Sequence, residues 1–146
     1  MQLFYIIFTR LYFFGIRLAS IFNPKAEAII RGHQNWRKNL INLIDKNENY
    51  IWVHCASLGE FEQGRPLIEK FKSDPLTQNY KILLSFFSPS GYEIRKNYNQ
   101  VDIVCYLPFD TRRNAHDFLQ IVNPKFAVFV KYEFWFNYLN ELFKHN

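Results

Sequence analysis

Between residues 50 and 146 the sequence alternates four times between a short apolar run and a longer amphipathic segment, and this alternation restricts the possible folds more than any other feature. The apolar runs are rich in β-branched and aromatic residues, which predicts buried strands at Tyr50–Cys55, Tyr80–Phe87, Asp102–Leu107 and Phe126–Val130. The other segments predict helices at Glu60–Ser73, Ser90–Asn97, Thr111–Val122 and Phe134–Phe143. Strands that alternate with amphipathic helices are typical of an α/β fold with a parallel, Rossmann-like sheet and flanking helices.

The segment Leu3–Phe22 is apolar at all but four positions. As a helix it would be about 30 Å long, which is enough to cross the hydrocarbon core of a membrane. Arg10 near its middle argues against a simple span, whereas Arg10 and Arg17 share one helical face and can both reach lipid headgroups. We therefore interpret residues 1–22 as a retained membrane-anchor helix that lies in or dips through the membrane. The alternative is an amphipathic helix that covers the core of the domain.

The net charge of +5 lies in the N-terminal third of the chain. Residues 1–46 carry seven bases and two acids, and the other 100 residues carry eleven of each sign. Residues 23–49, which begin with a capping Asn23 and Pro24, predict a basic linker helix ahead of a domain at residues 50–146. Bases beside an anchor favour the anionic cytoplasmic leaflet, so we expect a membrane partner on the cytoplasmic side and no nucleic acid.

In a parallel sheet the loops that follow the strands meet at one edge, where open α/β sheets bind their ligands. In the first loop, Gly59 permits a tight turn, and Glu60 lies in the first turn of the next helix. The helix dipole favours an ionised carboxylate there, and such a carboxylate at the edge is a candidate general base. The alternative is that Glu60 only supports the start of the helix.

The other loops add polar groups to this edge. Ser88-Pro89-Ser90-Gly91 offers hydroxyls and amides to an anionic or sugar ligand, unless it is a simple turn. Asp110 is predicted to cap the third helix. Lys131 and Glu133 beside Trp135 fit carbohydrate contact, or else form a surface salt link over a core tryptophan.

Two further observations limit the chemistry. His54 lies within the first predicted strand, and we interpret it as a core histidine. The sequence contains no phosphate-binding glycine motif and no metal-ligand spacing. The edge is therefore expected to bind a sugar without a metal or a cofactor.

Four segments at these loops resemble the 3-deoxy-D-manno-octulosonic acid (Kdo) transferases of lipopolysaccharide synthesis. They read I-W-V-H-C-A-S-L-G-E-F, S-F-F-S-P-S-G-Y-E, Y-L-P-F-D and E-F-W-F-N, in that order. The segment Arg31–Trp36 is also similar to an R-G-x-x-x-W segment that follows the N-terminal anchor in this family.

The resemblance implies a GT-B glycosyltransferase of the inner (cytoplasmic) membrane that moves Kdo from CMP-Kdo to a lipid A precursor. It also implies that these residues form a truncated, N-terminal, acceptor-binding half, with most of the donor site in a C-terminal half. A competing interpretation is a membrane-tethered half-domain that binds an anionic glycolipid without turnover. A flavodoxin-like signalling domain is less well supported, because the first strand does not end in an acidic cluster.

By this resemblance Glu60 corresponds to the catalytic base of the family, within S-x-G-E. It would take the proton from a glucosamine hydroxyl as that oxygen attacks the anomeric carbon of Kdo, CMP would leave, and the anomeric centre would invert without a metal. The residues expected to bind the acceptor are Ser57, Gly59, Ser88, Ser90, Gly91, Lys131 and Glu133.

The last motif departs from the family pattern. Lys131 stands where the family commonly has an acid, and Phe136 stands where it commonly has a proline. The stabilising role of that acid is therefore not assigned to Lys131, which could instead hold a phosphate.

Overall fold

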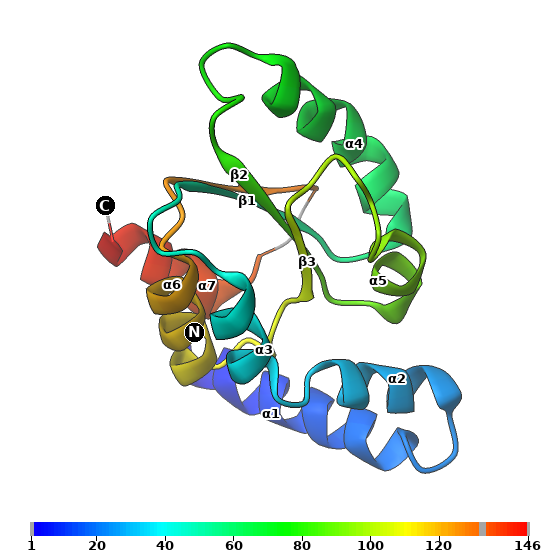
Figure 1. Cartoon of the computed structure of the whole chain (residues 1–146). Helices are drawn as coiled ribbons and strands as arrows, with labels where there is room; N and C mark the ends of the chain where they lie inside the picture. Colours follow the sequence, from blue (N-terminus) through cyan, green and yellow to red (C-terminus); the bar gives the residue numbers. More distant parts are fainter. Residues whose placement is uncertain (1, 132–133, 146) are drawn as a thin grey trace.

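The computed structural model describes residues 2–131 and 134–145, and its centre is a four-stranded parallel sheet in the order β3-β2-β1-β4 (Figure 1). The strands are β1 (Tyr50–Cys55), β2 (Lys81–Phe86), β3 (Ile103–Tyr106) and β4 (Phe126–Phe129). Each lies within one residue, at either end, of the predicted run. The prediction of an α/β fold with a parallel sheet is confirmed.

Helices cover both faces of the sheet, as Figure 1 shows. On one face lie α4 (Leu58–Ser73) and α5 (Pro89–Arg95), and on the other lie α3 (Trp36–Leu43), α6 (Arg112–Val122) and α7 (Phe136–His145). Successive residues of β1 point to opposite faces, so that Trp52 joins the core beneath α6 and α7 while Val53 joins the core beneath α4. All six residues of β1 are buried, as expected for an inner strand.

Two glycines allow α4 and α5 to approach the sheet closely. A Cβ on Gly91 in α5 would lie 2.2 Å from the ring of Phe86, and a Cβ on Gly64 in α4 would lie 2.8 Å from the side chain of Val130. A larger residue at either position would push its helix away from the strands. The lack of a side chain at these positions lets the first two turns of both helices pack against the carboxyl edge of the sheet.

The segment that was predicted as one basic helix over residues 23–49 forms two helices, α2 (Pro24–Gly32) and α3, so that prediction is wrong. Between them Asn35 has a left-handed backbone, with φ of 54°. His33 is buried at the break, and its ring nitrogens lie 2.6 Å from the carbonyl oxygen of Ile29 and 2.7 Å from that of Leu107. The break allows α3 to bury Leu40 in the core while α2 packs beside α1.

The N-terminal helix α1 (Gln2–Ala19) packs on the domain near the carboxyl edge of the sheet. The hydroxyl of Tyr5 donates a hydrogen bond to Asp110, and the ring of Phe13 lies 4.2 Å from that of Phe109. No single helix among the described residues is both long and apolar enough to cross a membrane; the bent pair of α1, from Phe4 onward, and α2, which meet at 119°, passes that test together. The membrane anchor therefore stays a prediction.

Candidate functional site

The loops after the strands meet at one edge because backbone hydrogen bonds continue past the strand ends. The N–H of Ser88 donates to the carbonyl of Ala56 at 2.8 Å, and the N–H of Leu107 donates to that of Phe86 at 2.7 Å. On the other side of β1, the N–H of Val130 donates to the carbonyl of His54 at 3.0 Å. The predicted edge of four adjacent loops is thus present.

Glu60 lies in the first turn of α4, and its carboxylate is held by the backbone. Its Oε2 accepts a hydrogen bond of 2.9 Å from the N–H of Ser57, which is the residue that caps the helix. This is the reciprocal arrangement of a capping box, so Glu60 does support the helix start. No group in the described part of the chain donates to Oε1 of the same half-buried side chain. The backbone therefore fixes the orientation of the carboxylate through one oxygen only.

Gly59 does not form the predicted turn. It lies inside the first turn of α4, and no glycine that the structure describes has a positive φ. The chain instead enters the helix through the extended backbone of Ser57, with φ of −139° and ψ of 171°. A Cβ on Gly59 would meet no atom within 4 Å, so this position leaves open space beside the positive end of the helix.

The second loop uses its hydroxyls locally. Ser88 caps α5, and its Oγ accepts from the N–H of Ser90 at 3.3 Å and lies 2.9 Å from the Oγ of Ser90. Gly91 is buried behind them against Phe86. The turn chemistry that was the alternative interpretation is therefore present, and the exposed Ser90 hydroxyl stays accessible to a ligand.

The fourth loop contributes Lys131, which is exposed and has a left-handed backbone, with φ of 66°. Within the described ranges no carboxylate lies at ion-pair distance from it. Glu133, the other predicted residue of this loop, lies outside the described residues. Lys131 is thus a cation at the end of β4 that an anionic ligand can reach.

His54 is a core residue, as predicted. Its side chain is fully buried, and its Nδ1 lies 2.9 Å from the hydroxyl of Ser85, which also accepts from the indole N–H of Trp52 at 2.7 Å. Burial lowers the pKa of His54 to about 3, so the ring is neutral at ordinary pH. His54 therefore supports the carboxyl edge from within the core and is not one of the residues that a ligand at this edge can contact.

Asp110 is not the cap of the third domain helix, and that prediction is wrong. Thr111 caps α6 instead, since its hydroxyl accepts from the N–H of Asn114 at 3.1 Å. Asp110 is only 1% exposed, and its Oδ2 accepts from the hydroxyl of Tyr5 and, at 3.2 Å, from the N–H of Asn137. Burial raises the pKa of its carboxyl group. The bond of Asp110 to Tyr5, 105 residues away, has no local sequence signal. The capping role of Thr111 could have been predicted, because threonine is a favourable cap.

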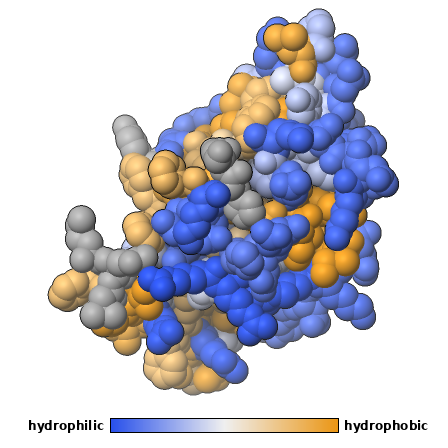
Figure 2. Space-filling model, turned by 90° about the vertical axis from the view of Figure 1, so that its left-hand side faces the viewer, coloured by the Kyte–Doolittle hydropathy of each residue, from blue (hydrophilic) through white to orange (hydrophobic). Residues whose placement is uncertain are grey.

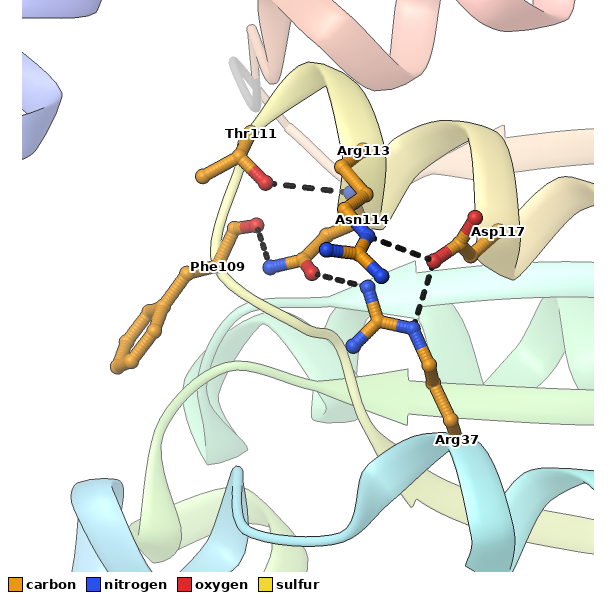
Figure 3. Close-up of polar contacts among 6 residues, drawn as sticks. All are labelled: Arg37, Phe109, Thr111, Arg113, Asn114 and Asp117. Atoms are coloured by element: carbon orange, nitrogen blue, oxygen red, sulfur yellow. Dashed lines mark hydrogen bonds and ion pairs between the residues drawn. The ribbon is translucent and has the colours of Figure 1, made fainter.

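A polar network, which the sequence analysis also missed, fixes the loop before α6 (Figure 3). From α3, Arg37 donates to Oδ2 of Asp117 at 2.6 Å and to the side-chain oxygen of Asn114 at 2.9 Å. The amide nitrogen of Asn114 in turn donates to the carbonyl of Phe109 at 2.8 Å. Figure 3 also shows Arg113 directed at the same oxygen of Asp117, with its Nε 3.8 Å away. The start of α6 is thereby held in place from α3.

Comparison with known proteins gives consistent matches. A family model described as 3-deoxy-D-manno-octulosonic-acid transferase matches residues 34–146. A bifunctional glycosyltransferase/methyltransferase of Fusobacterium nucleatum is 36% identical over 104 residues, which cover 69% of this chain and 16% of that protein. The 3-deoxy-D-manno-octulosonic acid transferase of Haemophilus influenzae is 30% identical over 97 residues (66% and 22%), and that of Aquifex aeolicus is 34% identical over 86 residues (58% and 23%). The chain thus spans less than a quarter of the length of these relatives.

Proposed function

Because this chain belongs to the 3-deoxy-D-manno-octulosonic-acid transferase family, as the match over residues 34–146 shows, we propose that it forms the acceptor-binding half of a Kdo glycosyltransferase of lipopolysaccharide synthesis. In this proposal Kdo moves from the sugar nucleotide CMP-Kdo to a lipid A precursor, by an inverting reaction that needs no metal. The GT-B architecture and the location at the cytoplasmic face of the inner membrane belong to the same proposal.

The carboxylate of Glu60 is the observation that carries this proposal. One of its oxygens is fixed by the N–H of Ser57, and no described group donates to the other, at the edge where a parallel sheet binds its ligands. A base must be oriented and must also keep a lone pair for the proton that it removes. Glu60 would accept the proton of an acceptor hydroxyl while that oxygen attacks the anomeric carbon of Kdo and the bond to CMP breaks.

The other edge residues have roles in acceptor binding in this proposal. Gly59 leaves room beside the first turn of α4, and the hydroxyl of Ser90 is exposed one loop away. Lys131 supplies a positive charge, which suits contact with a phosphate of a lipid A precursor. It is not assigned the stabilising role of the acid that the family commonly has at this position. Ser57, Ser88 and Gly91 shape the two loops through the contacts described above.

The test is Glu60→Gln in a complete transferase that carries these residues together with a donor-binding half. Glutamine also serves at the third position of a capping box, so the fold should be retained, with a stability change of at most about 1 kcal/mol. Turnover with CMP-Kdo should fall about 10²–10⁴-fold, the usual contribution of a general base. Glu69→Gln, a change of the same kind on the exposed side of α4, is the control. Turnover of the Glu60 variant within about threefold of the unmodified enzyme would end the case for this base.

The 146 residues alone are expected to bind the acceptor without transferring Kdo. The reason is that a GT-B site is assembled between two halves, and the relatives are more than four times as long as the stretch they share with this chain. The measurement is Kdo transfer and acceptor binding by the isolated chain. Robust transfer would show that the donor site lies within these residues, and the proposed division of labour would be wrong.

A further inference from the structure

A cavity of about 350 Å³ lies between α1 and the first turn of α6, and Glu60 does not line it. It is lined from α1 by Ile6, Thr9, Arg10 and Phe13, from the start of α6 by Asp110, Thr111, Arg112 and Arg113, and from α7 by Asn137. Three arginines from two helices thus line one cavity, together with the carboxyl-bearing Asp110. The volume is sufficient for a phosphate group with a small substituent.

The arginines of this cavity are available to a ligand. Neither Arg10 nor Arg112 forms an ion pair or a side-chain hydrogen bond with any residue that the structure describes, and Arg113 only shares Asp117 with the closer Arg37. Arg112 and Arg113 also lie in the first turn of α6, where backbone N–H groups have no helical acceptor and the helix dipole favours an anion. An arginine fork beside such amides is the usual way in which proteins bind phosphate.

The carboxyl group of Asp110 does not oppose an anion strongly. Its Oδ2 is occupied by Tyr5 and Asn137, and its Oδ1 is buried and accepts no hydrogen bond within the described part of the chain. Burial already raises the pKa of this group, and a nearby phosphate would raise it further. The protonated form carries no charge and can donate a hydrogen bond.

The position of the cavity on α1 indicates where a phosphate would come from. At about 100° per residue, the docked side chains of Tyr5 and Phe13 lie on one side of the helix, and Arg10 and Arg17 lie on its flank. The opposite side exposes large apolar residues, namely Phe4, Ile7, Phe8, Leu11, Phe14 and Leu18. In Figure 2 hydrophobic and long hydrophilic side chains lie together at the lower end of the molecule, the level at which Figure 1 places α1. This arrangement is typical of a helix that lies flat at an interface, with its arginines at the depth of the headgroups.

We propose that the cavity between α1 and α6 binds a phosphate group through Arg10, Arg112 and Arg113. The site is separate from the proposed transfer reaction and does not depend on it. The shared chemistry is a phosphate monoester or diester, which either a lipid headgroup or a soluble phosphate compound can supply. Binding of the lipid would hold α1 in its docked, in-plane position.

The first experiment measures backbone amide chemical shifts of the ¹⁵N-labelled 146-residue chain during titration with inorganic phosphate. The amides of Arg112 and Arg113 should move, and Arg10→Gln with Arg112→Gln should abolish the movement. The control is Lys25→Gln with Lys38→Gln, which also removes two exposed positive charges, but from positions outside the cavity. The exposed arginines make no contact that folding needs, so both double variants should melt like the unmodified chain.

The second experiment separates the two sources of phosphate. Partition onto vesicles of phosphatidylcholine with one third phosphatidylglycerol should fall at least tenfold more in the arginine variant than in the lysine control. If the arginine variant loses vesicle binding relative to the lysine control, the site binds a lipid headgroup. If the arginine variant loses only the response of the amides to inorganic phosphate, the site binds a soluble phosphate ester. Equal losses in both variants on vesicles, together with unmoved amides of Arg112 and Arg113, would overturn the proposal, because the charge effect would then be non-specific. Either result leaves the test on Glu60 unaffected.

Discussion

At the scale of single residues, the carboxyl edge is built on polar groups that are buried and partly satisfied. His54 is held by Ser85 on one side, while its Nε2 has no hydrogen-bond partner in the described chain. Asp110 is held by Tyr5 and Asn137. Burial disfavours the charged form of both groups, so they link the stability of the domain to pH.

We predict that His54 makes the fold sensitive to acid. Its pKa is about 3 in the folded chain and about 6.5 when unfolded, so the unfolded state takes up the proton first as the pH falls. The stability is complete above pH 6.5 and decreases by up to about 1.4 kcal/mol per pH unit from there toward pH 3. His54→Gln should remove this contribution. The check is the free energy of unfolding by urea at several pH values between 6.5 and 4, in both proteins.

Between those pH values, the free energy of unfolding of the unmodified chain should fall more steeply with decreasing pH than that of His54→Gln. The difference in slope should approach that of one bound proton, about 1.4 kcal/mol per pH unit. His33, whose pKa burial also lowers, is present in both proteins and cancels in the comparison. Parallel curves would show that His54 is accessible to protons in the folded state.

At the scale of the elements, the contact between α3 and α6 depends on the partly buried pair of Arg37 and Asp117. The side chains are 39% and 28% exposed, and Arg37 also bonds to Asn114. By contrast, the pair of Arg31 and Glu27 within α2 is 67% and 50% exposed, with a longer distance of 3.5 Å. Solvent screens the second pair much more than the first.

A double-mutant cycle should therefore give a coupling energy of about 1 kcal/mol for Arg37→Gln with Asp117→Asn. The same cycle on Arg31→Gln with Glu27→Gln should give about 0.5 kcal/mol or less. Both are measured by urea unfolding of the four proteins of each cycle. A coupling for the α3–α6 pair no larger than that of the α2 pair would mean that Asn114 alone fixes the loop.

The elements that the sequence predicted correctly are those whose signal is local. The strands end within one residue of their predicted bounds because their apolar runs are continuous and helices cover both faces of the sheet. The break between α2 and α3 was missed because His33 bonds to Leu107, 74 residues away, and nothing in the local pattern requires Asn35 to be left-handed.

Within the candidate site, the sequence was enough to predict the position of Glu60 in the first turn of its helix. It predicted only that Glu60 could support the helix start, and not the specific bond to the N–H of Ser57. The role of Asp110 required knowledge of where α1 packs.

At the scale of the whole molecule, α1 is part of the fold as well as a candidate contact with a membrane. Deletion of residues 1–22 would uncover Phe109 and the buried carboxyl of Asp110, and would lower stability along with any membrane affinity. Substitution of the exposed side alone separates these two effects. Phe4, Phe8 and Leu11 are 79%, 68% and 65% exposed and belong to that side.

We predict that the triple change Phe4→Gln, Phe8→Gln and Leu11→Gln lowers partition onto lipid vesicles about a hundredfold or more. Each of these side chains contributes about 1.5–3 kcal/mol when it is fully buried in an apolar phase. The melting temperature should stay nearly constant, because the side chains are exposed in the folded chain. The control is Ile41→Gln, Leu76→Gln and Ile94→Gln, three exposed apolar positions elsewhere on the surface. Equal partition of the two triple variants would refute the anchor.

The two contacts of α1 have a geometric consequence. Tyr5 and Phe13 are eight residues apart, so the helix is fastened to the domain at two points about 12 Å from each other. With two such contacts, α1 cannot rotate freely relative to the domain. A surface that holds the free side of α1 therefore also sets the direction in which the carboxyl edge faces and the height at which it stands. Under the proposed function, Glu60 would then meet its acceptor in two dimensions. The rate of that encounter would follow the number of acceptor molecules per unit area of the surface and not their number per unit volume of solution.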